Sequence, residues 1–518
     1  IAEAASVLVS ATRDGVRTGA DADLAALSPT MIFRSSHGLT RLVMAGPDRP
    51  EMQACRDDVV FGALVRRATW VAESSSGPPT PASPPRSVVR DLVINPPEGL
   101  PRLETLQETP VFGASGRLLI ERGYHADDAC WVEPGTLEDV EVSDTPTRDE
   151  VATAVSFLLD DVVGDFPFAS QADRANCLAM FLLPFARRLF TGCTPLHVIE
   201  APTPGSGKGY LAKVLGAMVV GRDIATSALP SDDDEIRKRL TAIFIAGDPI
   251  VVLDNVDNAG VLGSPALAAA ITSDPYRDRI LGQSAMVAFP NRVTWVMTAN
   301  NPTFNADVVR RTIRIRLDAK SMRPHERTGF RHDPIIPWVI ANRAKAVQAC
   351  LTIVRHWLVS GRAPGTRVVG SFESWSRTIG GVLAAAAVSG FLDNQDEHRA
   401  RSDAESDEWS ELFWFWWDKW GPTEVRASDV AELCHERQLL LHVRGMGSER
   451  SVASRVGRAL VNAEDRFFGQ WQVRRGRSER GGSSLYRLTR TVEQAPGAST
   501  SNGPTASASP RTEVDPFA

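Results

Sequence analysis

A glycine-rich loop with a lysine lies between a short apolar run and a helical pattern. It follows the apolar residues 196–199, precedes residues 210–215, and consists of Pro204, Gly205, Ser206, Gly207, Lys208 and Gly209. Glycines let backbone N–H groups approach phosphate oxygens, and the helix N-terminus and a lysine ammonium add positive charge. These six residues are therefore predicted to bind a nucleotide. The full P-loop pattern is not met at two positions. Pro202 stands where the first glycine should be, and Gly209 stands where Ser or Thr would ligate Mg²⁺.

Two later strand-like segments end in polar residues that could complete such a site. Residues 250–253 lead into Asp254, and residues 292–299 lead into Asn300 and Asn301. Four apolar residues that end in a carboxylate are typical of a buried parallel strand with an acid at its C-terminal edge, which is where a second nucleotide-binding group belongs, near the metal. Asp254 is therefore a candidate for this second group. Each segment alone is compatible with an ordinary strand end or turn, but the three in this order favour a nucleotide site.

In this order, the segments resemble the AAA+ P-loop ATPases and, within them, the superfamily 3-like helicases. Such proteins form the C-terminal helicase half of phage, plasmid and mobile-element primase–helicases. The resemblance spans residues 148–490 and includes the segments 233–240, 327–330 and 371–375, together with Trp338 and Arg343. It implies an α/β multi-domain chain with a P-loop core built on a parallel sheet, helical flanking regions and a C-terminal winged helix.

The resemblance also implies roles for individual residues. The implied catalytic residues are, in chain order, Asp254, Asn300, Asn301, Arg310 and Arg311. The lysine of the loop would hold the β- and γ-phosphates of ATP, the aspartate would hold Mg²⁺, and one of the two asparagines would orient the attacking water. One of the two arginines would reach the γ-phosphate of a neighbouring subunit. Such an arginine finger, supplied by a neighbouring subunit, contributes about 10³–10⁵ in rate. It also makes activity depend on a ring, typically a hexamer in this family.

The residue after the predicted magnesium ligand departs from the family pattern. Asn255 stands where many AAA+ enzymes carry a glutamate that acts as the general base. Asp257 or another acid such as Glu200 could take this role. We expect hydrolysis of the nucleotide rather than binding alone.

Residues 275–290 contain two strand-like stretches around Gly282 and Gln283, which predicts a hairpin. In the family, a hairpin before the asparagine strand lines the ring pore and tracks DNA. Arg277 and Arg279 flank the hairpin and are candidate contacts to DNA phosphates, although its tip has no lysine. The alternative is a hairpin with a structural role only.

The C-terminal part combines an aromatic helix with a basic module. The aromatic residues between 409 and 420 recur at helical spacing, which favours core packing over base stacking. Two helical patterns, a strand, a basic glycine-rich loop and a strand then follow over 427–490, as in a winged helix. Residues 441–490 contain eleven arginines and only four acidic residues. The arginines predicted to contact DNA are Arg455, Arg458, Arg474, Arg475, Arg477 and Arg480. The alternative is a basic surface without a ligand.

The composition is that of a globular protein with several domains. The 518 residues are 43% hydrophobic and 23% charged, and the net charge of −6 means that any surface for nucleic acid must be local. The longest apolar stretch, near 382–392, falls short of the roughly 20 residues of a membrane span. Six scattered cysteines without CxxC spacing indicate reduced thiols, and we expect the protein in the cytoplasm of a bacterial host. Because the chain starts at Ile1, we expect it to be a fragment.

Shifts in composition and periodicity predict the domain boundaries. Residues 1–147 form an α+β support region with a Pro/Ser-rich linker at 74–85, and the remaining predicted parts are a helical region (148–192), the P-loop core (193–320), a helical lid (321–400), the aromatic helix with the winged helix (407–490) and a disordered tail (491–518).

Two functions compete for this organisation. The first is an ATP-dependent DNA helicase or translocase of a phage, plasmid or mobile-element replication system, which would hydrolyse ATP between the subunits of a ring. It would bind single-stranded DNA in the pore and duplex DNA at the winged helix, with a primase domain or chain as partner. The second is an ATP-binding replication initiator or origin-binding protein with little or no unwinding activity. A regulatory ATPase that acts on a protein partner is disfavoured by the basic C-terminal module.

Overall fold

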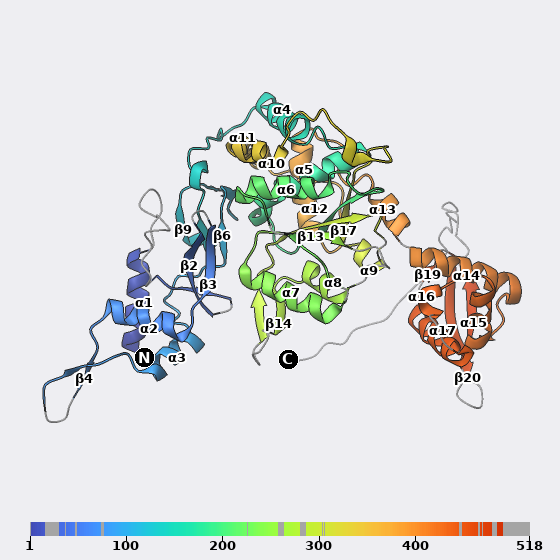
Figure 1. The fold of residues 1–518 in the computed structure, drawn as a ribbon, viewed down its shortest axis with the longest axis horizontal. Coiled ribbons are helices and arrows are strands. Elements are labelled where there is room, and N and C mark those ends of the chain that lie inside the picture. Colours follow the sequence, from blue (N-terminus) through green and yellow to red (C-terminus); the bar gives the residue numbers. More distant parts are fainter. Residues whose placement is uncertain are drawn as a thin grey trace, which may run out of the picture. The chain divides into compact units, whose positions relative to one another are not determined.

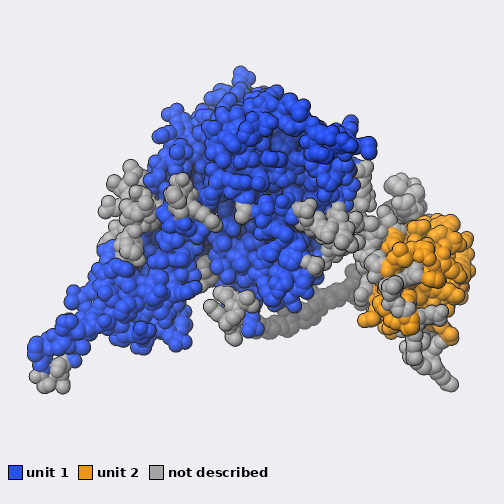
Figure 2. Space-filling model, in the orientation of Figure 1, with its two compact units in different colours: residues 1–404 blue, residues 405–518 orange. Residues whose placement is uncertain are grey.

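The chain forms two compact units, residues 1–404 and 405–518, which Figure 2 shows in different colours. The computed structural model describes residues 2–15, 31–36, 38–46, 49–73, 77–224, 226–230, 232–256, 264–279, 286–302, 304, 306–402, 404–444, 448–464, 467–468, 470–478 and 484–490. The predicted disordered tail, 491–518, lies outside these residues. Within them, every helix is too short or too polar to cross a membrane.

A parallel sheet of five strands forms the centre of the first unit (Figure 1). The strands lie in the order β12 (Thr226–Ser227), β13 (Ile250–Val256), β16 (Thr294–Asn300), β11 (Leu196–Ala201) and β17 (Thr312–Arg316), and all neighbouring pairs are parallel. All six residues of β11 are buried, as expected for a strand that is covered on both faces. The predicted α/β class with a parallel sheet is therefore confirmed.

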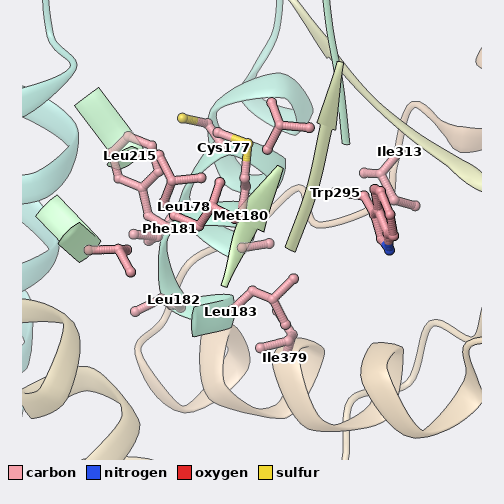
Figure 3. Close-up of a cluster of buried hydrophobic side chains, with 14 of the residues drawn as sticks. Cys177, Leu178, Met180, Phe181, Leu182, Leu183, Leu215, Trp295, Ile313 and Ile379 are labelled. Atoms are coloured by element: carbon pink, nitrogen blue, oxygen red, sulfur yellow. The ribbon is translucent and has the colours of Figure 1, made fainter. Parts of the chain in front are cut away.

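Helix α5 (Gln171–Ala186) packs against this sheet and forms much of its core. Its side chains Cys177, Leu178, Met180, Phe181, Leu182 and Leu183 lie in one buried cluster with Leu215, Trp295, Ile313 and Ile379 (Figure 3). The other helices of the core and its flanks are α6 (Lys208–Val220), α7 (Asp233–Ala246), α8 (Pro265–Thr272), α9 (Ala306–Val309), α10 (Ile335–Ala341), α11 (Arg343–Val359), α12 (Glu373–Ala385) and α13 (Gln395–Ser402).

The helical pattern that begins at residue 148 is interrupted before α5. Helix α4 (Arg148–Ser156) starts at a capping box, because the Thr147 hydroxyl accepts from the Glu150 N–H while the Glu150 carboxylate accepts from the Thr147 N–H. A π-helical turn over Phe157–Val162 follows. At Gly164 the chain passes so close to the Asp160 carbonyl that a Cβ would lie 2.1 Å from its oxygen. Only glycine fits there, and the chain leaves the helix to form a loop.

The N-terminal region of the first unit consists of short elements. Its helices are α1 (Ala2–Gly15), α2 (Asp57–Arg67) and α3 (Arg86–Ile94). One sheet contains β1 (Phe33–Ser35), β2 (Gly38–Gly46) and β3 (Arg49–Ala54), and a second contains β6 (Thr105–Gln107), β10 (Cys130–Val132) and β9 (Gly123–His125). Strands β7 (Val111–Phe112) and β8 (Leu118–Leu119) form a separate pair. The predicted linker at 74–85 differs from expectation. Its residues Thr80–Pro81 (β5) pair with Val71–Ala72 (β4), so the chain doubles back as an exposed ribbon.

Arginine side chains join this N-terminal region to the core. The Arg222 guanidinium donates to both carboxylate oxygens of Glu108, one of them at 2.9 Å. Arg343 donates to the Glu108 carbonyl at 2.6 Å and to the Met218 and Val219 carbonyls at the end of α6. Burial lowers the pKa of Arg343 to about 10. The last turn of α6 and the N-terminal region are thus bound by the same side chain.

The second unit has a core of its own. Helices α14 (Ala404–Trp420), α15 (Ala427–Glu436), α16 (Leu441–Arg444) and α17 (Glu449–Ala463) accompany an antiparallel sheet in the order β18 (Val425–Arg426), β21 (Ser484–Arg490), β20 (Trp471–Ser478) and β19 (Phe467–Phe468). Trp409, Phe413 and Trp416 are buried in this core, where the rings of Trp409 and Phe413 contact Phe468 and the ring of Trp416 contacts Phe413. The predicted core role of the aromatic stripe is therefore confirmed.

Candidate functional site

Three segments that are far apart in the sequence meet at the carboxyl edge of the central sheet. The glycine-rich loop follows β11, Asp254 lies near the end of β13, and Asn300 ends β16, which is the strand between them. In parallel sheets, ligands bind in the crevice outside these strand ends. A pocket of about 860 Å³ opens here, lined by Asp165, Phe166, Pro167, Pro204, Gly205, Ser206, Gly207, Lys208, Gly209, Tyr210, Lys213, Asp254, Thr298, Asn300, Pro324, His325, Arg327, Phe330, His332, Asp333, Pro334 and Ile335.

The loop has a backbone that only glycine adopts easily. Gly205 and Gly207 have φ values of 78° and 97°, in the left-handed region. A Cβ at Gly207 would also lie 3.3 Å from the Phe166 ring. The Ser206 hydroxyl donates to the Thr203 carbonyl at 2.7 Å and holds the turn together. The loop therefore brings Lys208 to the first position of α6. The first backbone N–H groups of a helix have no partner within the helix, and such helix ends bind anions.

Lys208 and Asp254 each have a partner on β16. The Lys208 ammonium donates to Asn300 Oδ1 at 2.7 Å, and the Thr298 hydroxyl donates to Asp254 Oδ1. Lys208 is only 9% exposed. Burial lowers its pKa, and the charge of Asp254 opposes that shift. A buried ammonium whose neutral partner is an amide gains stability from an anion in the pocket.

The residues present fit a Mg²⁺ ion that is held by one carboxylate and mainly by the phosphates of a bound molecule and water. Within the described part of the chain, no cluster of three or more His, Cys, Asp or Glu side chains could hold a metal. Asp254 lines the pocket, and its charge acts on the Lys208 ammonium. Mg²⁺ commonly binds through one or two carboxylates together with substrate phosphates and water. Gly209 contributes no oxygen, yet a Cβ built there meets open space.

The alternative general base is contradicted at one of its two positions. Glu200 is buried and accepts hydrogen bonds from Arg314 Nε at 2.9 Å and Arg316 Nη1 at 2.7 Å. It is not among the residues that line the pocket. The suggestion that Glu200 acts as base is therefore wrong, because its charge is already paired inside the protein. Asp257 lies outside the described residues, as does the side chain of Asn255.

The two candidate asparagines have different surroundings. Asn300 lines the pocket and contacts the lysine, whereas Asn301 is exposed and accepts from Arg316 Nη1 at 3.1 Å. Asn300 is therefore the one of the pair that is placed for contact with a ligand.

The candidate finger arginines lie at the opposite end of β17 from Arg316. Both Arg310 and Arg311 form ion pairs with Asp307, and the Arg310 side chain is 61% exposed. Neither belongs to the described residues that line the pocket of their own chain. Within one chain, they are therefore not part of the site.

Sequence reasoning missed the outer wall of the pocket. It is built from the loop after α4, which supplies Asp165 and Phe166, and from the segment 324–335, which supplies Phe330 and Ile335. Gly164 and Pro167 are the sequence signal for a break in the helical pattern before α5. The segment 327–330 was singled out only through the family resemblance.

Two arginines fasten these two parts of the wall to each other. Arg327 Nη2 donates to the Asp165 carbonyl at 3.0 Å, and the Arg331 backbone N–H donates to Asp165 Oδ2 at 2.6 Å. The Arg331 guanidinium also pairs with Asp161 at 2.6 Å. The wall that carries Phe166, Phe330 and Ile335 therefore depends on contacts between segments about 165 residues apart in the chain.

The predicted hairpin is present and is anchored to α7. Strand β14 (Tyr276–Arg279) pairs antiparallel with β15 (Met286–Phe289), and residues 280–285 lie outside the described chain. Asp278 accepts from the Thr241 hydroxyl at 2.6 Å and from the Tyr276 hydroxyl at 3.0 Å. Because side chains alternate along the strand, Arg277 and Arg279 lie on the exposed face.

The basic residues of the second unit lie on α17 and β20. Arg455 Nη1 donates to Ser451 Oγ at 2.7 Å, Arg474 donates to Gln472 Oε1, and Arg458, Arg474 and Arg475 are exposed. Strands β20 and β21 pair antiparallel up to Ser478 and Ser484. Two remaining predicted arginines cannot be placed, since Arg480 and the side chain of Arg477 lie outside the described residues.

No protein-family profile and no curated protein matches the chain. Solved structures with similarity include the apo C-terminal region of NrS-1, at 10% identity over 88% of this chain and 96% of that one, with a TM-score of 0.39. The SCCmec type IV Cch active helicase is 10% identical over 90% of this chain and 98% of that one, with a TM-score of 0.33. An inhibitor-bound JCV helicase is 13% identical over 43% and 63%, with a TM-score of 0.22. These overall similarities are low.

Proposed function

We propose that this chain binds ATP with Mg²⁺ at the carboxyl edge of the sheet, hydrolyses it, and uses the reaction to move along DNA as a helicase. The proposal is carried by one observation. A glycine-rich loop, a buried lysine paired with Asn300, and Asp254 paired with Thr298 converge in one pocket. Such a set of groups suits phosphoryl transfer, where catalysis consists of positioning and charge stabilisation.

The pocket offers different chemistry at its two ends. At the polar end, the loop N–H groups and Lys208 would hold the phosphates, and Asp254 would hold Mg²⁺. When bound, this ion would neutralise charge that develops on the phosphate oxygens. Asn300 would orient the attacking water. At the other end, Phe166, Phe330 and Ile335 supply the apolar surface that a nucleobase requires.

The ring and the DNA contacts are further parts of the proposal. Arg310 and Arg311 lie outside the pocket of their own chain, which suits a role in the pocket of a neighbouring copy. Arg277 and Arg279 on the anchored hairpin would contact DNA in the pore. We interpret the second unit as a winged helix in which α17 and the β20–β21 pair bind duplex phosphates. The host system would be a phage, plasmid or mobile element that also supplies a primase.

A second candidate function has one observation in its favour. Gly209 gives the nucleotide site no hydroxyl ligand for Mg²⁺. An ATP-binding initiator that assembles on DNA with little hydrolysis would tolerate this loss. The two candidates differ in turnover, because the motor hydrolyses ATP faster when DNA is bound and the initiator does not.

The deciding experiment is the ATPase rate of the full chain with and without single-stranded DNA. Lys208→Ala is the test variant, and Lys238→Ala is the matched control, because that lysine pairs with Glu235 on the surface of α7. The motor predicts turnover that rises with DNA, is lost in Lys208→Ala and is kept in Lys238→Ala. Binding of ATP and DNA without turnover would support the initiator. Turnover that survives Lys208→Ala would reject this pocket as the site.

A further inference from the structure

Two consecutive asparagines at the end of β16 face different partners. Asn300 accepts from the Lys208 ammonium at 2.7 Å, and Asn301 accepts from Arg316 Nη1 at 3.1 Å. The backbone of Asn301 has a φ of 41°, in the left-handed region that few residues other than glycine adopt. Asparagine tolerates this region better than most residues do. The direction of the Asn300 side chain thus depends on a turn that begins at the next residue.

Arg316 is itself held from two directions. Its Nη1 donates to Glu200 Oε1 at 2.7 Å, and its backbone N–H donates to Asp173 Oδ1 at 2.8 Å. Glu200 stands opposite Arg316 in the β11–β17 register and is shared with the buried Arg314 at 2.9 Å. The guanidinium that contacts Asn301 is therefore held by a charged hydrogen bond to Glu200 on the neighbouring strand β11, and the Arg316 backbone is held by Asp173 on α5. Hydrogen bonds to charged groups are stronger than neutral ones.

We infer that Arg316 is a positioning residue for the nucleotide site, acting through Asn301 to keep the Asn300 amide directed at Lys208. This inference rests on the proposed ATPase function. Arg316 is not among the described residues that line the pocket, so it acts through its neighbour rather than on the ligand. Its planar donor group bridges Glu200 and Asn301 at once. When this bridge is lost, the Asn301 backbone can leave the left-handed region, and Asn300 turns away from the lysine.

The test is a double-mutant cycle between positions 316 and 301 in the full chain. Arg316→Met is preferred over a change at Glu200, because removing Glu200 would leave Arg314 buried without its carboxylate. Arg316→Met is expected to lower kcat about ten- to hundredfold, as small misplacements of catalytic groups do, with KM for ATP changed less than about twofold. Arg367→Met, which removes a surface arginine paired with Asp393, is the matched control and should leave both constants unchanged.

The second arm uses Asn301→Gly, since glycine adopts a positive φ without help. In that background, Arg316→Met should change kcat by less than about threefold, because the turn no longer depends on the arginine. An equally large loss of kcat in both backgrounds would overturn the inference, as would a tenfold rise in KM, which would indicate direct contact with the nucleotide. Lys208→Ala, measured in parallel, distinguishes a failure of the proposed ATPase site from a failure of the positioning role of Arg316. If it abolishes turnover while Arg316→Met has no effect, only the positioning role fails.

Discussion

Restoring the missing hydroxyl at position 209 is a direct test of how the site handles Mg²⁺. Gly209 is the second residue of α6, its φ is not positive, and a Cβ there has no atom within 4 Å outside its chain neighbours and the backbone of its own helix. Gly209→Ser should therefore fold without strain. Gly209→Ala introduces the same Cβ without the oxygen and is the matched control.

The expected magnitudes follow from this geometry. Both variants remove a helical glycine, so each should raise the free energy of unfolding by up to about 1 kcal/mol. Of the two variants, only the serine adds a side-chain oxygen at this position of the pocket lining. If that oxygen replaces one water of Mg²⁺ with a gain like that of one polar contact, about 1 kcal/mol, the Mg²⁺ concentration for half-maximal activity should fall about fivefold.

The assay is the ATPase rate of the full chain titrated with Mg²⁺ at saturating ATP, with thermal unfolding measured on the same samples. Serine should lower the half-maximal Mg²⁺ concentration, whereas alanine should leave it unchanged. Equal Mg²⁺ dependence in both variants would refute the reasoning that position 209 faces the metal. A loss of stability in either variant would contradict the open space around the residue.

Three further predictions concern other parts of the molecule. Burial lowers the pKa of His197 from 6.5 to about 4, so the unfolded chain binds a proton more readily than the folded protein does. Protonation of the unfolded chain therefore reduces the free energy of unfolding as the pH falls below about 6.5. Between pH 7 and pH 5, the wild type should lose about 2 kcal/mol more of this free energy than His197→Leu loses. Arg331→Met opens the contact with Asp161 and the pocket wall, and because this pair is half exposed, KM for ATP should rise only about two- to fivefold. Arg458→Gln on α17 should weaken DNA binding and reduce the slope of log affinity against log salt by about 1.

Each of these measurements has a control and an outcome that would contradict it. For the histidine, chemical unfolding at both pH values should show the same loss in the two proteins if the side chain is exposed instead. For the pocket wall, Arg323→Met removes an exposed arginine that directly precedes the segment 324–335 and should leave KM unchanged. For DNA, Lys419→Gln removes a charge from the same unit, and an equal change in slope would mean that α17 has no special part in binding.

The inner half of the pocket could be predicted because its chemistry follows strand ends. The glycine-rich loop, Asp254 and Asn300 each come directly after an apolar run, and parallel strands bring such ends to one edge. The hairpin was predictable for a similar reason, since two strand-like stretches flank a glycine. These features depend on local patterns that a single sequence displays.

The rest of the site depends on contacts that no local pattern encodes. Asp165 reaches the pocket because Arg327 and Arg331 hold it across the fold. The pairing of Glu200 with Arg316 becomes visible only when the register of β11 and β17 is known. Without that register, a carboxylate close to the glycine-rich loop was a reasonable candidate for the base. The exposed ribbon at 71–81 was missed because proline-rich composition predicts an open chain but not its pairing.

Glu108 contacts two arginines, Arg222 and Arg343, that are synthesised long after it, and this has a consequence for folding during synthesis. Arg222 follows Glu108 by 114 residues, and Arg343 donates to the Glu108 carbonyl across 235 residues. At about 5–20 residues per second, the ribosome needs roughly 10–50 s to make the second arginine after the glutamate. During this interval the N-terminal region has left the ribosome without the surface that it covers in the finished protein. The contacts that join the N-terminal region to the core are therefore completed only late in synthesis, after the start of α11 has been made.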